Sequence, residues 1–348
     1  MKVIKTLSLL VFLLFSYNSY AKNIVIVTTG GTISGAGESS NEVKYVPGKI
    51  TVESLLKSVP NLEKFANIKA EQLMQISSQD ITSQDWIKIA NKLNDLLSRS
   101  DVDGVVLTHG TDTLEETAYF LNLVLKSKKP VIIVGSMRPS TSISADGSMN
   151  IYNAVALASS KDAYNKGVLV LLNDEIYAAR DVSKLHTTNV NSFKSPNSGP
   201  IGQVYYGDVK IYYENLRLHT ASSNFSVKNI VDLPKVDIIY AHAGFDSGIV
   251  DYLVKSGSKA IVVAGVGDGN INKETMNKLI DARKKGVFIV RSSRVGAGAV
   301  VRNTEVEDDK FDFITSDNLS PQKARILTIL ALTKTENSKK ISEMFGKY

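Results

Sequence analysis

Short apolar runs of strand length alternate along this chain with longer segments whose apolar residues recur every three or four positions. The first run is 23–29 (NIVIVTT), and later runs cover 68–76, 104–108, 130–135 and 167–172. The segments between them have the period of amphipathic helices, and they begin at Val52, 85, Leu114 and 150. This alternation predicts an α/β fold, with a doubly wound and mostly parallel sheet flanked by helices.

The periodicity weakens between 216 and 235 and resumes at Val236 (VDIIYAHAG). Beyond it the pattern predicts strands at 259–264 and 287–290, a helix at 273–285 and a terminal helix from Pro321. We therefore predict two domains, joined by a linker over 216–235. The larger N-terminal α/β domain, 22–215, is expected to carry catalysis, and the smaller C-terminal α/β domain covers 236–348.

The N-terminal segment differs from the rest of the chain. Lys2 and Lys5 precede an apolar run from Leu7 to Phe15, and Ser19-Tyr20-Ala21 has the small residues of a cleavage site. The run is shorter than the roughly 20 residues that span a bilayer. We predict a secretory signal peptide at 1–21, a periplasmic location, and no membrane association after cleavage.

Composition narrows the class of protein. Hydrophobic residues make up 43% of the 348 positions and charged residues 22%, which is typical of a soluble globular chain. The formal net charge of +6 is diffuse, so we expect no nucleic-acid partner. There is no cysteine, so export brings no disulfide. The histidines have no ligand-like spacing, so no metal site is predicted; they are His109, His186, His219 and His242.

The first segment with candidate chemistry is 29–33 (TGGTI). Gly30 and Gly31 end the first predicted strand and place the hydroxyl of Thr32 at its carboxyl end, where such sheets bind ligands. Thr32 is therefore a candidate nucleophile. The alternatives are an ordinary turn or a phosphate loop, although the run lacks the GK[ST] ending of a P-loop.

The second segment is 107–116 (LTHGTDTLEE). Thr113 and Glu116 have capping-box spacing ahead of an apolar helix, which places Thr111 and Asp112 at the helix N-terminus. Free backbone N–H groups there favour an anionic group such as a substrate carboxylate. Asp112 alternatively serves only to cap the helix.

Together, TGGTI and HGTDT resemble the paired signature of the bacterial L-asparaginase and glutaminase-asparaginase family, of the type II periplasmic kind. Five further segments are similar to family motifs in the expected order: 76–80 (ISSQD), 134–147 (VGSMRPSTSISADG), 180–184 (RDVSK), 265–270 (GVGDGN) and 291–295 (RSSRV). The similarity extends over 23–348. It implies hydrolysis of L-asparagine to L-aspartate and ammonia, without a cofactor.

The resemblance also implies catalytic roles. Thr32 is the nucleophile that forms an acyl-enzyme. Tyr45 lies beside it on the glycine-rich loop 34–49, which acts as a lid. The second threonine and its acidic and basic partners are Thr111, Asp112 and Lys184. A lysine is protonated at neutral pH, so Lys184 is a poor base as it stands, and the general base is left open.

Substrate-binding roles follow from the same resemblance. Ser78, Gln79 and Asp112 match positions that hold the substrate's α-carboxylate and α-amino groups, beside Thr111. Asn270 and Glu305 match positions that reach the active site of a neighbouring subunit, which implies a homotetramer with shared sites. From composition alone, Glu305 would be a solvated acidic loop residue.

Two other functions remain open. An exported amino-acid binding protein also has two α/β domains, but it needs no nucleophile. A broad-specificity glutaminase-asparaginase accepts one more methylene, which a pocket discriminates by only about 1–3 kcal/mol. Ser136 and Asp268 stand where some family members have alanine and asparagine, so they bear on the choice between asparagine and glutamine.

Overall fold

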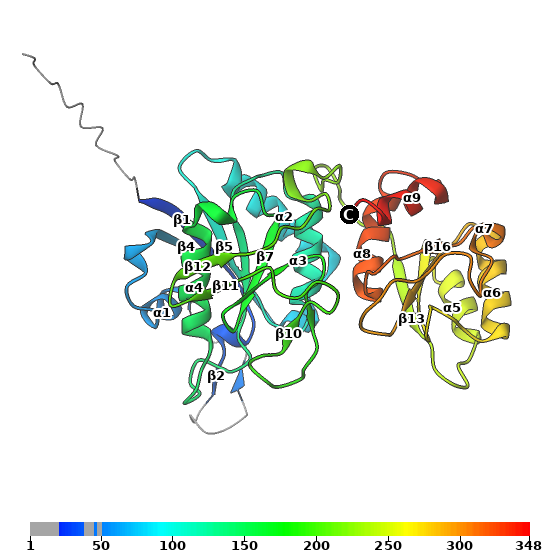
Figure 1. The fold of residues 1–348 in the computed structure, drawn as a ribbon, viewed down its shortest axis with the longest axis horizontal. Helices are drawn as coiled ribbons and strands as arrows, with labels where there is room; N and C mark the ends of the chain where they lie inside the picture. The colour runs from blue at the N-terminus through cyan, green and yellow to red at the C-terminus, as the bar shows by residue number, and fades with distance from the viewer. Residues whose placement is uncertain (1–20, 38–44, 47–50) are drawn as a thin grey trace, which may run out of the picture.

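The computed structural model describes residues 21–37, 45–46 and 51–348, and it has two lobes lying side by side (Figure 1). Within these residues the N-terminal lobe holds one sheet of eight strands: β1 (Lys22–Gly30), β4 (Ala66–Ile76), β5 (Gly104–Thr108), β6 (Val131–Val134), β7 (Val168–Leu172), β8 (Glu175–Ala178), β11 (Gly202–Tyr205) and β12 (Asp208–Ile211). Their order is β12-β11-β8-β7-β6-β5-β1-β4. The strand pairs β4–β1, β1–β5, β5–β6 and β6–β7 are parallel. The pairs β7–β8, β8–β11 and β11–β12 are antiparallel.

Helices cover both faces of this sheet. The alternate residues Ile24 and Ile26 of β1 pack on the side of α4 (Gly147–Ser159). Val25 and Val27 pack on the opposite side, with α2 (Ser83–Ser98) and α3 (Leu114–Val124). Because both faces are buried, the central strands have continuous apolar sequences and not alternating ones. A short helix, α1 (Val52–Lys57), precedes β4.

The smaller lobe holds a parallel sheet with the order β13-β14-β15-β16. These strands are β13 (Val236–Tyr240), β14 (Ala260–Gly265), β15 (Phe288–Ser293) and β16 (Ile314–Thr315), and the helices are α5 (Gly248–Lys255), α6 (Lys273–Lys284), α7 (Asp308–Phe311), α8 (Pro321–Leu332) and α9 (Ser338–Phe345). Helix α8 packs against β13, β14 and β15, and also against α3. It therefore joins the two lobes into one apolar core, to which Phe225 and Leu233 of the segment 216–235 also belong.

The predicted fold class is confirmed, with a larger, mostly parallel sheet followed by a smaller α/β unit. The sequence pattern did not predict the antiparallel strands β8, β11 and β12 or the helices α5 and α9. The predicted domain limits at 215 and 236 stay predictions. They fall between β12, which ends at Ile211, and β13, which begins at Val236.

Two predicted segments lie partly or almost wholly outside the described residues. The signal peptide prediction covers 1–21, of which only Ala21 is described. Of the predicted lid loop 34–49, the structure describes 34–37 and 45–46, where β2 (Ala36–Gly37) pairs antiparallel with β3 (Tyr45–Val46). No helix within the described ranges is both long and apolar enough to cross a membrane.

Candidate active site

The two threonine-bearing motifs lie next to each other because β1 and β5 are adjacent parallel strands. Thr28 of β1 is in register with Thr108, the last residue of β5. The hydroxyl of Thr29 donates to the Thr108 carbonyl oxygen at 2.9 Å, which ties the two strand ends together. The loops that leave these ends therefore meet at the carboxyl edge of the sheet, where doubly wound folds bind ligands.

The two loops touch backbone to backbone. Gly31 has φ of +80°, and a Cβ there would lie 2.4 Å from the Cα of Gly110. A Cβ on Gly110 would in turn lie 2.6 Å from the hydroxyl oxygen of Ser78. Only glycine fits at both positions. The short helical turn Thr32–Ser34 begins directly after Gly31 and keeps Thr32 at this junction.

Gly31→Ala is expected to lower the free energy of unfolding by more than about 2 kcal/mol and to remove most activity, because it adds a backbone clash to an unfavourable φ. Gly244→Ala is a matched control, since Gly244 has φ of +71° and no heavy atom within 4 Å of an added Cβ. Urea unfolding and activity assays of both variants measure the difference. Equal losses in the two would show that the Gly31–Gly110 contact is unimportant.

A cavity of about 200 Å³ opens at this junction. Its lining residues are Gly31, Thr32, Ser77, Ser78, Gln79, Gly110, Thr111, Asp112, Met137, Lys184 and Thr187. Thr32 and Thr111 are 8% and 5% exposed, so both hydroxyl-bearing side chains are held almost out of bulk water. The structure thus brings six predicted site residues to one cavity: Thr32, Ser78, Gln79, Thr111, Asp112 and Lys184.

Lys184 connects the second threonine to the acidic residue that follows it. It lies in β9 (Ser183–Lys184), which pairs with β10 (Phe193–Lys194). Its Nζ donates to Thr111 Oγ1 at 3.0 Å and to Asp112 Oδ1 at 2.7 Å. The Lys184 side chain is 16% exposed, whereas that of Asp112 is 58% exposed. Because Lys184 donates to the Thr111 oxygen, the proton of the Thr111 hydroxyl can be donated into the cavity.

Ser78 fixes the two residues that precede helix α3. Its hydroxyl accepts a hydrogen bond from the backbone N–H of Asp112 at 3.2 Å, and its carbonyl oxygen accepts one from the Thr113 hydroxyl at 2.7 Å. The predicted capping box of Thr113 and Glu116 is therefore wrong. Thr113 is the N-cap, but its hydroxyl bonds to Ser78 and makes no cap hydrogen bond.

Four other predicted residues do not line this cavity or have side chains outside the described part. Asn270 and Glu305 are in the smaller lobe, where Asn270 Nδ2 donates to Glu305 Oε2 at 2.7 Å, and neither lines the cavity. Tyr45 lies in β3 opposite Gly37, and its side chain is outside the described part. Ser136, a specificity candidate, is buried and donates to the carbonyl oxygen of Arg138 at 2.8 Å.

The sequence pattern did not point to Lys323, a buried residue of α8 that supports the segment carrying Lys184. Its Nζ donates to the carbonyl oxygens of Arg180, at 3.0 Å, and of Val182. Burial lowers the pKa of Lys323 to about 8. The only signal in the sequence is a lysine near the start of the apolar helix 321–332, a position that is usually solvent-exposed.

His109 directly precedes Gly110 of the cavity lining, but its side chain is fixed by local bonding. Its Nδ1 lies 2.7 Å from the carbonyl oxygen of Gly110, and complete burial lowers the pKa of its imidazole to about 4. It is therefore neutral at physiological pH and donates to that carbonyl. Within the described residues, no group of three or more histidine, aspartate or glutamate side chains could hold a metal ion.

Comparison with known proteins gives two family matches that together cover most of the chain. Residues 23–217 match the family "Asparaginase, N-terminal" and residues 235–345 match "Glutaminase/Asparaginase C-terminal domain". A glutaminase-asparaginase of Pseudomonas fluorescens biotype A is 49% identical, over 94% of this chain and 90% of its own length. The L-asparaginase 2 of Escherichia coli strain K12 is 47% identical, over 94% of this chain and 93% of its own.

A solved structure gives the same result in three dimensions. The probable cytoplasmic L-asparaginase of Campylobacter jejuni is similar with a TM-score of 0.91 and 47% sequence identity. The match covers 94% of this chain and all of that one. Both lobes and the connection between them are therefore shared with that protein.

Proposed function

Since the chain belongs to the asparaginase family and hydrolyses L-asparagine to L-aspartate and ammonia, we propose that Thr32 is its nucleophile. The observation that carries this proposal is the meeting of Thr32 and Thr111 at one small, almost buried cavity, with Lys184 bonded to Thr111. A binding protein needs no such pair of hydroxyl groups. Two threonines suit a reaction with two steps, acylation and hydrolysis.

In the proposed first step, the Thr32 oxygen attacks the side-chain amide carbon of asparagine. A bond forms from Oγ to carbon, the carbon–nitrogen bond breaks, and ammonia leaves with the proton from the hydroxyl. Tyr45 is proposed to act beside Thr32 in this step, which is the role that the family resemblance implies. The result is a β-aspartyl ester of Thr32.

In the second step a water molecule attacks this ester and releases L-aspartate. Lys184, bonded to Thr111 Oγ1 and Asp112 Oδ1, holds the Thr111 hydroxyl in a fixed direction. We propose that Thr111 orients the attacking water and the ester carbonyl. This arrangement uses Lys184 as a protonated donor, so it does not require a neutral lysine.

The remaining cavity residues suit the fixed charges of an amino acid. The Asp112 carboxylate, which is more exposed than Lys184, can accept hydrogen bonds from the substrate ammonium group. Ser78 and Gln79 line the same cavity and can donate to the substrate α-carboxylate. Recognition of the amino-acid end therefore places the amide at the two threonines.

We further propose that the protein is a homotetramer in which Asn270 and Glu305 complete the site of a neighbouring subunit. Support comes from large side chains left exposed on β13 and α5, with Tyr240 60% and Tyr252 64% exposed in the single chain. Such a surface is typical of an interface. Light scattering coupled to gel filtration tests this, and an active monomer would contradict it.

Export to the periplasm is proposed from the basic, apolar and small-residue regions of 1–21. The relative from Campylobacter jejuni is called a probable cytoplasmic enzyme, whereas a relative from Haemophilus influenzae is called a probable periplasmic one. Fractionation of cells, with N-terminal sequencing of the protein recovered, tests the proposal. A mature chain starting at Lys22 in the periplasmic fraction is expected, and an uncleaved chain in the cytosol would contradict it.

The substrate preference is tested by ammonia release from L-asparagine and L-glutamine in parallel. We expect asparagine to be the better substrate and glutamine to be hydrolysed measurably, because one methylene changes the rate by only about 10- to 200-fold. Equal rates would indicate the broad-specificity glutaminase-asparaginase that one relative's name describes. Binding of either amino acid without ammonia release would indicate a binding protein.

Chelation is expected to have no effect. Every proposed step uses a hydroxyl, ammonium or carboxylate group of the chain, so overnight dialysis against EDTA should leave the rate of ammonia release unchanged. The control is the same enzyme dialysed against buffer alone. A loss of activity that added Mg²⁺ or Zn²⁺ restores would contradict the proposed mechanism.

A further inference from the structure

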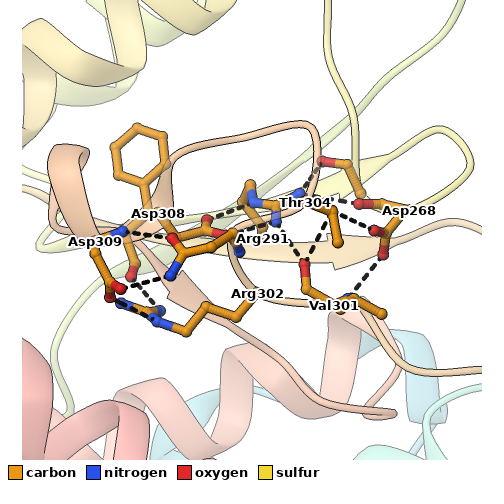
Figure 2. Close-up of polar contacts among 10 residues, drawn as sticks. Asp268, Arg291, Val301, Arg302, Thr304, Asp308 and Asp309 are labelled. Carbon is orange, nitrogen blue, oxygen red and sulfur yellow. Dashed lines mark hydrogen bonds and ion pairs between the residues drawn. The ribbon is translucent and has the colours of Figure 1, made fainter.

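A buried arginine organises the part of the smaller lobe that carries Asn270 and Glu305. Arg291, on β15, is 1% exposed, and Asp308 beside it is fully buried. The guanidinium forms a two-point pair with Asp308, from Nε to Oδ1 at 2.6 Å and from Nη2 to Oδ2 at 2.8 Å (Figure 2). A two-point pair of this kind fixes the orientation of both side chains.

The same guanidinium binds two loops at once. We call residues 265–270 the glycine loop and residues 301–308 the acidic loop. Arg291 Nη1 donates to the carbonyl oxygen of Asp268 in the glycine loop at 2.9 Å, and Nη2 donates to that of Val301 in the acidic loop at 3.1 Å. Arg291 therefore fixes the backbone of the two loops relative to each other.

Asp268 forms a second link between these loops, nearer to the surface. Its Oδ1 accepts from the backbone N–H of Val301 at 2.8 Å, and its Oδ2 accepts from the hydroxyl of Thr304 at 2.8 Å (Figure 2). A single carboxylate of the glycine loop thus holds both the start and the middle of the acidic loop. Without it, Arg291 would still bind both loops, but the acidic loop would lose the two bonds that fix Val301 and Thr304 against the glycine loop.

The two linked loops carry the predicted binding pair, Asn270 in the glycine loop and Glu305 in the acidic loop. Asn270 exchanges backbone hydrogen bonds with Val266, at 2.8 and 2.9 Å, which closes the glycine loop. Glu305 directly follows Thr304, and its carboxylate accepts from Asn270 Nδ2 at 2.7 Å. The position of Glu305 is therefore determined on one side by the Asp268–Thr304 bond and on the other by Asn270.

We propose that Asp268 is a positioning residue that holds Glu305 and Asn270 in the geometry required to bind the α-ammonium group of the substrate in the neighbouring subunit's site. This inference rests on the proposed function, in which these two residues complete that site. A carboxylate such as Glu305 attracts an ammonium group strongly only when its oxygens are fixed in direction. Asp268 itself does not touch the substrate.

The experiment compares Asp268→Ala with Asp268→Asn, Asp309→Ala and Glu305→Ala in the full-length assembled enzyme. Asparagine at 268 can still accept from the Val301 N–H and donate to the Thr304 hydroxyl. Asp309 is the matched control, because it bonds to Arg302 and Asn303 within the acidic loop and makes no bond to the glycine loop (Figure 2). Each variant is assayed with L-asparagine and with succinamic acid, which is asparagine without its α-amino group.

We expect Asp268→Ala to raise KM for L-asparagine about tenfold, with kcat within about threefold of the wild type, because the loop no longer holds Glu305. Asp268→Asn and Asp309→Ala should stay close to the wild type. With succinamic acid, Asp268→Ala should have no effect on KM, since there is no ammonium group to bind. In a Glu305→Ala background, Asp268→Ala should add nothing further.

The outcomes separate this inference from the function on which it rests. If Glu305→Ala raises KM for asparagine and Asp268→Ala does not, the positioning role is overturned and the proposed site stands. If Asp268→Ala impairs both substrates equally, Asp268 has only a structural role and the inference fails. If Glu305→Ala leaves KM unchanged, the shared site itself is contradicted, and the inference fails with it.

Discussion

Replacing Thr32 by alanine is expected to lower kcat for L-asparagine hydrolysis by about a thousandfold or more. In the proposed mechanism no ester can form without the Thr32 oxygen, so water would have to attack the amide directly. Thr32 lines the cavity and belongs to neither side of the sheet core, so the fold should survive. Ammonia release under saturating asparagine measures the change.

The matched control for this variant is Thr28→Ala. Thr28 lies on β1, is 3% exposed and does not line the cavity, so its loss should reduce stability and leave kcat within about threefold. Urea unfolding of both variants separates the two effects. Near wild-type turnover in folded Thr32→Ala would refute its role as nucleophile.

Thr111→Val is expected to lower steady-state turnover by a similar factor, about a thousandfold, but at a different step. Valine has nearly the shape of threonine and no hydroxyl, so Lys184 loses one acceptor while the cavity keeps its form. Thr32 can still attack the amide. The resulting ester should persist because the attacking water is no longer oriented.

Rapid-quench kinetics distinguish this step from acylation. Thr111→Val should release about one ammonia per active site in a fast first phase and then almost none. Thr32→Ala should show no such phase, which makes it the control. If Thr111→Val also lacks the first phase, Thr111 is required for acylation, and its proposed role in hydrolysis of the ester is wrong.

The parallel strands of the larger sheet could be predicted from sequence because their residues are buried on both faces. The run 104–108 has no polar residue before Thr108, and its strand has those bounds in the structure. The antiparallel extension was harder to predict because β8, β11 and β12 are only four residues each. Their turn signals were present, since Asn173 and Asp174 both have positive φ in the β7–β8 hairpin.

The part of the candidate site that lies at the carboxyl edge of the larger sheet could be predicted from the sequence. The order of the parallel strands brings the loops after β1 and β5 together, and this places Thr32 beside Thr111 and Asp112. Lys184 comes from a two-stranded ribbon, and only the resemblance to the family pointed to it. The direction of the Thr113 hydroxyl depended on Ser78, which is distant in sequence, so local spacing gave the wrong partner.

A residue that supports a site residue without lining the cavity could not be predicted from the hydrophobic pattern of the sequence. Lys323 is in a helix that is apolar on both sides, because α8 lies between the smaller sheet and α3. Lys323 is only 1% exposed, and it donates to the carbonyl oxygens of Arg180 and Val182. The hydrogen bonds of Lys323 depend on how the two lobes pack. The sequence of the helix alone does not determine that packing.

Mapping of the covalent intermediate tests the central claim most directly. Wild-type enzyme and Thr111→Val are mixed with L-asparagine, quenched in acid within milliseconds, digested and analysed by mass spectrometry. The proposed mechanism predicts a mass increase of one aspartyl group on the peptide that contains Thr32, transient in the wild type and persistent in Thr111→Val. An adduct on the wild-type peptide that contains Thr111, or rapid turnover with no adduct on Thr32 in either protein, would contradict it.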